Sequence, residues 1–178
     1  MKHRILILSP SLIAPGGVER VVAALSGLFA EHHTVFECSF DPPDRQRHFE
    51  SPATFVPLGA SLRLPLLLRP ISYLIDAFRL RRVKRMLDID ITISNLWRAD
   101  LLSVLSGGKD TKISICHINI KNNPSNRLMM KLLPLVAWVY RRFDHLVTVS
   151  RPLADEIQHL YHIDEGRLSV IYNPVPPK

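Results

Sequence analysis

The sequence has few cysteines, and their spacing does not suggest a disulfide framework or a cysteine metal site. Cys38 and Cys116 are the only two among 178 residues, and each lies in an apolar stretch without C-x-x-C spacing. Isolated thiols in such stretches are typical of buried cysteines in a reducing compartment. None of the eight histidines has a metal-ligand spacing such as H-E-x-x-H. We therefore expect a cytoplasmic protein without a metal site.

Long hydrophobic runs are also missing from the sequence. The most apolar segments, 64–75 and 128–140, are interrupted by Arg69-Pro70 and by Lys131 and Pro134, respectively. Both fall short of the roughly 20 apolar residues that a membrane-spanning helix needs. The apolar stretch after the basic N-terminus is broken by prolines, which is not typical of a signal peptide.

Acidic residues are scarce relative to basic ones. The chain has 16 Asp and Glu against 23 Lys and Arg, which gives a formal net charge of +7. Such a balance favours anionic partners, namely phosphorylated substrates, nucleic acid or acidic lipids. The length suits one domain with a substantial core, and the fourteen prolines indicate many loops rather than a helical bundle.

Short apolar runs alternate with helical patterns along most of the chain. Because these runs are continuous rather than alternating, both faces of the sheet should be covered. The pattern predicts an α/β fold, with a doubly wound, mainly parallel Rossmann-like sheet and helices on both faces. Ligands bind beyond the carboxyl ends of such strands, so four loops (10–17, 95–98, 117–123 and 150–151) should meet at one edge. The expected strands are 4–9, 34–40, 54–57, 89–94, 112–116, 145–150 and 168–172, and the expected helices are 18–31, a part of 71–87, 99–106, 125–142 and 152–161.

A strand, a glycine turn and a helix start follow one another near the N-terminus. The apolar run 4–9 leads into a loop that ends with Gly16 and Gly17, and an apolar helical pattern then opens at Val18. Glycines let the backbone approach a ligand closely, and the start of a helix favours an anion such as phosphate. The loop has neither G-x-G-x-x-G nor the Lys-Ser/Thr of a P-loop, so a plain strand-to-helix turn is the alternative.

Three blocks of sequence carry a resemblance to a known family. They are Ile5-Leu6-Ile7-Leu8-Ser9 with Gly16-Gly17-Val18-Glu19-Arg20, then Ile113-Ser114-Ile115-Cys116-His117, and finally Leu146-Val147-Thr148-Val149-Ser150-Arg151-Pro152-Leu153-Ala154 continuing to Val170-Ile171-Tyr172-Asn173-Pro174-Val175. Together they resemble the N-terminal half of a family 4 glycosyltransferase, a retaining enzyme with two facing Rossmann-like domains (the GT-B fold).

The resemblance implies a division of the chain and of the enzyme. Residues 1–172 would form the Rossmann-like, acceptor-binding domain, and residues 173–178 would begin an interdomain linker. The C-terminal domain, which in this family binds the nucleotide-sugar donor and supplies a Glu-x₇-Glu pair, would be absent. On this interpretation, this domain binds no cofactor, the nucleotide-sugar donor is expected in the full enzyme, and the chain alone is expected to be inactive.

The resemblance also implies roles for individual residues. Gly16 and Gly17 would face the donor diphosphate across the cleft, and His117 would be the catalytic residue that contacts the donor sugar or the acceptor. A histidine can hydrogen-bond a sugar hydroxyl or hold a developing charge, although at a strand end it can also be merely a half-buried polar residue. The predicted acceptor-binding residues are Glu19, Asn95, Trp97, Arg98, Asn119 and Lys121.

Several of these acceptor residues have a simpler interpretation as well. Asn95, Trp97 and Arg98 are expected in a loop after the strand at 89–94, where the indole of Trp97 could stack on a sugar or instead cap the core. Glu19 is favoured at the start of a helix whatever its function, and Asn119 and Lys121 could be solvated loop residues.

The stretch 62–85 combines many basic residues with many apolar ones, and Asp76 is its only acidic residue. An amphipathic segment of this kind can lie on an anionic membrane surface, and many members of the resembled family act there on lipid-linked acceptors. The alternative is an ordinary helix that covers the sheet and has a solvated basic edge. The predicted membrane contacts are Arg63, Arg69, Arg79, Arg81, Arg82, Lys84 and Arg85.

These observations predict the acceptor-side domain of a hexosyltransferase-type enzyme, peripheral on the cytoplasmic face of the membrane. It would help to move a sugar, with retention, from a nucleotide-sugar donor to a lipid-linked or membrane-bound glycan. One alternative is a non-catalytic basic module for a phosphorylated ligand or nucleic acid, and another is a membrane-anchoring subunit of a two-chain transferase. The basic residues cluster beside leucines rather than beside stacking aromatics, so no nucleic acid partner is expected.

Overall fold

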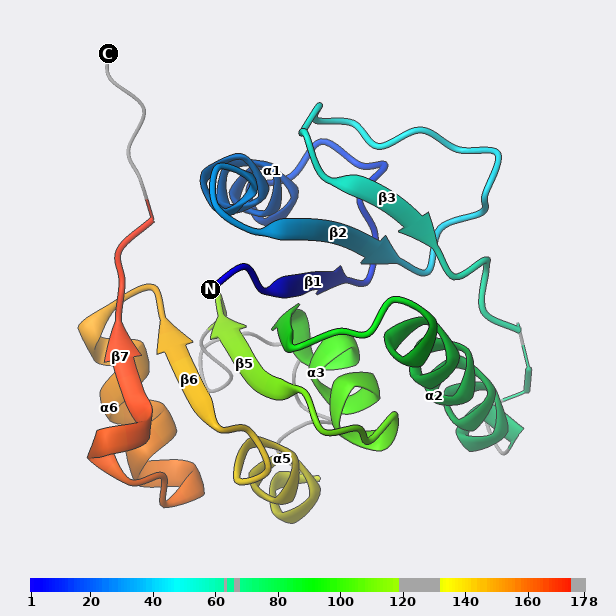
Figure 1. The fold of residues 1–178 in the computed structure, drawn as a ribbon. Coiled ribbons are helices and arrows are strands. Elements are labelled where there is room, and N and C mark those ends of the chain that lie inside the picture. Colours follow the sequence, from blue (N-terminus) through cyan, green and yellow to red (C-terminus); the bar gives the residue numbers. More distant parts are fainter. Residues whose placement is uncertain (63, 66–67, 119–131, 174–178) are drawn as a thin grey trace.

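The chain forms a single sheet of parallel strands with helices on both faces (Figure 1), as the sequence predicts. The structure, a computed structural model, describes residues 1–62, 64–65, 68–118 and 132–173. The strand order is β3-β2-β1-β4-β5-β6-β7, and each neighbouring pair is parallel. In chain order the elements are β1 (Arg4–Ser9), α1 (Gly17–Ala30), β2 (Thr34–Ser39), β3 (Thr54–Pro57), α2 (Arg69–Met86), β4 (Ile91–Asn95), α3 (Leu96–Leu105), β5 (Thr111–Cys116), α5 (Leu133–Tyr140), β6 (His145–Thr148), α6 (Arg151–Tyr161), the 3-10 helix η3 (Glu165–Arg167) and β7 (Leu168–Val170).

Strand β1 is the point at which the direction of the strand order reverses. It pairs with β2 on one side and with β4 on the other, and Leu8 lies opposite both Cys38 and Ser94. In an open parallel sheet, this reversal leaves a crevice beyond the carboxyl ends of the two central strands. The fold therefore places the loop after β1 and the end of β4 next to each other.

The helices divide unequally between the two faces. Helix α1 lies on one face, and α2, α3, α5 and α6 lie on the other (Figure 1). Strand β1 contributes to both layers, because Ile5 and Ile7 pack in the cluster that includes α1, while Leu6 and Leu8 pack against α2 and α3. This burial on both sides explains why the strand is an uninterrupted apolar run.

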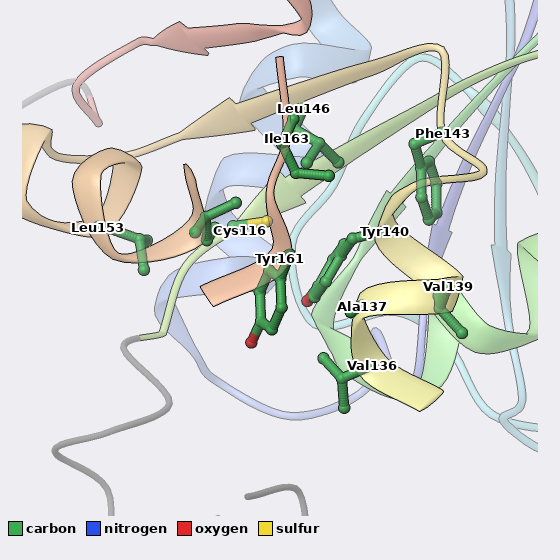
Figure 2. Close-up of a cluster of buried hydrophobic side chains, with 11 residues drawn as sticks. Cys116, Val136, Ala137, Val139, Tyr140, Phe143, Leu146, Leu153, Tyr161 and Ile163 are labelled. Atoms are coloured by element: carbon green, nitrogen blue, oxygen red, sulfur yellow. The ribbon is translucent and has the colours of Figure 1, made fainter. Parts of the chain in front are cut away.

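A third cluster fills the space between α3, α5 and α6 (Figure 2). The rings of Tyr140 and Tyr161 lie side by side, with centroids 5.1 Å apart, and Phe143 packs beside Tyr140. Leu153 and Ile157 of α6 complete this cluster. It anchors α5 and α6 behind β5 and β6, and it brings the hydroxyl of Tyr140 into the interior.

The junction between β4 and α3 differs from the sequence prediction. A loop at 95–98 and a helix from 99 were expected, but β4 ends at Asn95 and α3 starts at Leu96. The predicted loop is wrong because Leu96 makes the whole turn by itself with a left-handed backbone (φ 69°). A leucine rarely adopts this conformation, so apolar patterning gives no signal of it. Of the expected helix 125–142, the described part is α5, and residues 119–131 lie outside the described residues.

Lys84 belongs to the interior rather than to the predicted membrane surface. Its side chain is buried beneath α2, and its Nζ lies 2.9 Å from Oδ2 of Asp110, just before β5. Burial lowers the pKa of Lys84, an effect that the adjacent carboxylate opposes. For Asp110 burial acts against ionisation, but Lys84, Thr92 and Lys112 together favour the charged form, so the pKa of Asp110 is lowered. Lys112 also pairs with Asp110 at 3.4 Å. This correction removes Lys84 from the predicted membrane contacts.

We predict that Lys84→Ala lowers the free energy of unfolding by about 3 kcal/mol or more, because it leaves a buried carboxylate without its closest cation. Urea denaturation of the chain measures the change. Arg82→Ala is the matched control, since Arg82 is exposed on the same helix and its loss should cost no more than about 0.5 kcal/mol. Equal effects of the two substitutions would contradict the structural role of the buried pair.

Candidate functional site

The carboxyl ends of three neighbouring strands are joined by one buried amide. Asn95, the last residue of β4, is fully buried, and its Nδ2 donates to the backbone carbonyl of Leu8 in β1 at 3.3 Å. Its Oδ1 lies 3.0 Å from Nε2 of His117, which directly follows β5. The predicted catalytic histidine thus lies beside the point where the strand order reverses.

The surroundings of His117 favour its neutral form. The residue is half-buried at the end of β5, and this burial lowers the pKa of its imidazole below the usual value. A neutral imidazole has one nitrogen that donates a hydrogen bond and one that accepts. His117 is therefore suited to contact a ligand hydroxyl without carrying a charge.

A buried carboxyl group, that of Asp100, lies one turn further along α3. Its Oδ1 accepts hydrogen bonds from Ser94 at 2.6 Å and Ser114 at 2.8 Å, which face each other in β4 and β5. Its Oδ2 accepts one from the hydroxyl of Tyr140 at 3.3 Å. Burial raises the pKa of Asp100 to about 7, although the three hydroxyls act in the opposite direction. The sequence analysis did not select Asp100, and its position inside an otherwise apolar helical run was the available signal.

A small cavity of about 70 Å³ lies next to His117, between β5 and the helices α3, α5 and α6. Its lining is mostly apolar, with a few polar groups that could fix the orientation of a bound group. The lining residues are Leu96, Trp97, Asp100, Ile115, Cys116, His117, Ile118, Tyr140, Leu153, Glu156 and Ile157.

Trp97 packs on the core and also lines the cavity beside His117. Its indole packs against the third hydrophobic cluster and meets Tyr140 edge to face, with ring centroids 6.2 Å apart. The same side chain lines the cavity beside His117. Trp97 therefore caps the core and remains available to a ligand.

Arg98 turns away from His117 and towards α2. Its Nη2 lies 3.2 Å from Oδ2 of Asp76 and contacts the hydroxyl of Ser61, and its guanidinium lies over the ring of Phe40 at 4.8 Å. It lines a second, larger hollow of about 560 Å³ between the chain that follows β2 and β3 and the start of α2. Arg69 and Tyr73 lie in the same hollow.

The roles predicted for Asn95 and Arg98 change accordingly. A loop position was expected for both, but Asn95 is a buried strand residue whose amide is engaged by the protein. It is not placed to contact an acceptor directly. Arg98 keeps access to a hollow at the carboxyl edge, although this hollow is not the cavity beside His117.

The glycine loop after β1 is held by a carboxylate that the sequence analysis did not select. Asp41 follows β2 and accepts hydrogen bonds from the backbone N–H of Leu12 at 2.7 Å, from Ser11 at 2.9 Å and from Ser39 at 2.8 Å. Asp41 is buried, so these bonds form away from water, where their loss is costly. The loop is therefore fixed to the end of β2 before the helix begins.

The two glycines of this loop have different surroundings. A Cβ atom at Gly16 would overlap the carboxylate of Glu19, so a side chain there would require the end of the Glu19 side chain to move. Gly17 is exposed at the first position of α1, and a Cβ there would meet no atom within 4 Å. Local packing therefore does not require a glycine at position 17, where a Cβ atom would face open space.

Helix α2 carries most of the predicted membrane contacts on its outer surface. Arg69, Arg81, Arg82 and Arg85 are exposed, whereas Arg79 is half-exposed and lies 3.6 Å from Oδ1 of Asp76. Apolar side chains are exposed on the same helix, at Ile71, Leu74, Phe78 and Met86. The predicted membrane contact Arg63 lies outside the described residues, and so do the predicted acceptor-binding residues Asn119 and Lys121.

The described ranges contain neither a helix that could span a membrane nor a cluster of metal-ligating side chains. No helix there is both long and apolar enough to cross a bilayer. Nor do three or more His, Cys, Asp or Glu side chains gather there in a way that could hold a metal ion.

Comparison with known proteins identifies the family of this chain. A sequence model of the family described as Glycosyltransferase Family 4 matches residues 15–178. No curated protein sequence matches the chain.

Several solved structures are similar in fold. Sucrose-phosphate synthase from Thermosynechococcus elongatus has a TM-score of 0.72 at 14% identity, over 96% of this chain and 48% of that chain. A lipopolysaccharide outer core galactosyltransferase has a TM-score of 0.69 at 16% identity, over 97% of this chain and 46% of that one. A glycosyltransferase from Rickettsia africae has a TM-score of 0.60 at 19% identity, with 98% and 44% covered. The chain thus spans about half the length of these structures, and identities at this level show a shared fold alone.

We predict that Asp100→Asn removes a pH dependence from the stability of the chain. Folded Asp100 keeps its proton up to about pH 7, whereas in the unfolded chain it loses the proton near the ordinary pKa of 3.8. The folded state therefore binds more protons between these values, and the stability of the natural chain should fall as pH rises through them. The slope from this one group is at most about 1.4 kcal/mol per pH unit. Chemical denaturation at a series of pH values measures the free energy of unfolding of both chains. The value for the variant relative to that for the natural chain should rise with pH up to about pH 7 and then level off.

The control for this experiment is Asp155→Asn, because Asp155 is exposed on α6 and forms a surface pair with Arg151. It should leave the pH dependence nearly unchanged. If the difference in the free energy of unfolding between Asp100→Asn and the natural chain stays constant from about pH 4 to pH 7, Asp100 is ionised in the folded chain throughout that range.

Proposed function

Because the chain belongs to glycosyltransferase family 4, we propose that it forms the acceptor side of a retaining sugar transferase, with the nucleotide-sugar donor held mainly by a second domain. The observation that carries the proposal is the meeting of His117 and the glycine loop at one edge of the sheet. Asn95 links β1 to His117 there, and the glycine loop starts directly after β1. The product would be an extended glycan on a lipid or membrane-bound acceptor.

Each part of this edge has a chemical task in the proposal. The exposed Gly17 lets the donor diphosphate approach the backbone, and the first N–H groups of α1 point to the side where the phosphate charge would lie. His117, in its neutral form, hydrogen-bonds a sugar hydroxyl as the sugar changes bonds. The proposal gives this side of the cleft neither a nucleophile nor a classical base.

We assign the acceptor to the larger hollow at the same edge. Arg69 and Arg98 line it together, and Asp76, which pairs with Arg98, also pairs with Arg79. The local balance is therefore positive, which suits an acceptor with a phosphate or another acidic group. Tyr73 and Phe40 add aromatic surface for a sugar ring.

The outer surface of α2 supports a membrane-bound acceptor. Ile71, Leu74 and Phe78 are spaced by three and four residues, so they share one stripe of the helix, and all are exposed. Arg81, Arg82 and Arg85 continue the exposed surface towards the end of the helix. The start of α2 also forms one wall of the acceptor hollow, so a membrane against this stripe would bring a lipid-linked acceptor to it. One protein of similar fold is described as a lipopolysaccharide outer core galactosyltransferase.

We predict that His117→Ala in the complete transferase lowers turnover by at least about tenfold, the loss expected from one hydrogen bond made in the transition state. The free energy of unfolding should change far less than for a core residue, because His117 is only half-buried. Steady-state sugar transfer and chemical denaturation measure the two quantities. His145→Ala is the control, since His145 lies at the start of β6 and its Nε2 is 2.9 Å from Ser169. An unchanged turnover for His117→Ala would remove His117 from the reaction.

We predict binding of the chain to vesicles that contain phosphatidylglycerol, with little binding to pure phosphatidylcholine. Co-sedimentation should weaken as salt is added, because each basic side chain near the surface contributes about 1 kcal/mol. Replacing both Leu74 and Phe78 with Ser should reduce binding several-fold. Leu28→Ser is the matched control, because Leu28 is equally exposed but lies on α1, on the other face of the sheet. Equal loss in both variants, or no binding to anionic vesicles, would contradict the membrane assignment.

A further inference from the structure

We propose that Asn95 is a positioning residue that keeps the proton of neutral His117 on Nε2 and thereby leaves Nδ1 to accept a hydrogen bond from a sugar hydroxyl. The inference rests on the proposed function of His117 and specifies which of its two ring nitrogens accepts the hydrogen bond. It also replaces the direct acceptor contact that the sequence suggested for Asn95.

The orientation of the Asn95 amide follows from its first partner. The carbonyl oxygen of Leu8 can only accept a hydrogen bond, so the group 3.3 Å away from it must be the amide N–H. The amide oxygen is then the group that faces His117 at 3.0 Å. An amide oxygen cannot donate, so Nε2 of the imidazole must donate and must carry a proton.

The backbone holds this amide in place from both sides. Asn95 is still paired with Ile115 in the ladder between β4 and β5, so it is fixed relative to the strand that carries His117. The next residue, Leu96, takes the left-handed conformation that turns the chain straight into α3. Non-glycine residues in that region cost free energy and persist where the surrounding structure fixes them, often at functional sites. No flexible loop separates the amide from the strand or the helix.

Burial makes this arrangement costly to change. Asn95 has no exposed surface, so a rotated amide would place its N–H₂ group against Nε2 and its oxygen against the Leu8 carbonyl, away from water. Two acceptors facing each other in the interior lose a hydrogen bond and remain unsatisfied. The single arrangement that satisfies all the groups is the one with the proton on Nε2.

This tautomer determines the kind of ligand group that His117 can bind. With the proton on Nε2, the nitrogen Nδ1 of the neutral ring carries a lone pair and accepts hydrogen bonds. A sugar hydroxyl can donate to it, whereas a fully ionised diphosphate oxygen cannot. His117 is therefore directed to a hydroxyl of the donor sugar or the acceptor, while the diphosphate is left to the glycine loop.

Nitrogen-15 NMR of the imidazole tests the inference directly on the unaltered chain. Above the pKa of His117, we expect a protonated, pyrrole-type signal for Nε2 and an unprotonated, pyridine-type signal for Nδ1. The opposite assignment, or an even mixture of the two tautomers, would overturn the proposal. This readout needs neither a donor nor an acceptor, so it is independent of the transferase assay.

Two variants separate positioning from mere stability. Asn95→Ala should shift the ring towards a mixture of tautomers, and Asn95→Asp should raise the pKa of His117 by about one unit or more, because a carboxylate then faces Nε2. Ser106→Ala is the control, since it removes a buried hydrogen bond at the opposite end of α3, from Ser106 to the carbonyl of Ser103. It should leave both the tautomer and the pKa of His117 unchanged. If Asn95→Ala and Asn95→Asp also leave both unchanged, Asn95 does not position the ring.

The complete transferase provides a final test of how Asn95 acts. Asn95→Ala should lower kcat more than it alters KM, and it should lower kcat little further when His117→Ala is already present, because its effect passes through the same ring. Additive losses in the double variant would show that Asn95 acts by another route. If the NMR result holds but His117→Ala leaves turnover unchanged, the tautomer assignment stands and the proposed function fails.

Discussion

The parallel alignment of the strands is the constraint on which the site depends. Because β1, β4 and β5 run in the same direction, their carboxyl ends reach one edge, and Asn95 at the end of β4 lies within hydrogen-bonding distance of Leu8 in β1 and of His117 after β5. Each strand contributes something different there: β1 a backbone carbonyl, β4 an amide and β5 the chain that carries His117. Antiparallel neighbours would place these groups at opposite edges. The apolar cores on the two faces keep the strands in this register, so packing far from the edge supports its geometry.

The buried carboxyl groups of the chain are stabilised in two ways. Glu37, Asp76 and Asp110 each pair with a cation, and these pairs tie strands and loops to the rest of the fold. Asp41 and Asp100, which lie near the proposed cleft, are held mainly by hydroxyl groups and one backbone N–H. Neutral donors fix a carboxyl group without adding positive charge beside it. Asp41 and Asp100 therefore take up none of the positive charge at the edge that is proposed to receive phosphate.

The sequence was sufficient for the architecture because apolar runs and glycine turns report directly on burial and chain reversal. It also selected His117, whose position beside the crevice follows from the order of strands. The loop expected at 95–98 was wrong, because the left-handed backbone of Leu96 cannot be recognised from the apolar pattern. The burial of Lys84 was also missed, because its partner Asp110 is distant in sequence. Asp41 and Asp100 went unnoticed for a similar reason: the partners that define them lie mainly on other elements. Pairings of this kind depend on tertiary structure and have no local signal.

The placement of the two tryptophans has an optical consequence. Trp97 lines the cavity beside His117 and packs on Tyr140, whereas Trp138 is partly exposed on α5 with the guanidinium of Arg142 4.2 Å above its ring. The chain contains no other tryptophan. An aqueous quencher such as iodide reaches the exposed indole more readily than the one packed in the interior, so the two emissions can be separated. The fluorescence that remains after quenching then comes mainly from Trp97, so it reports on a ligand that enters the cavity beside His117.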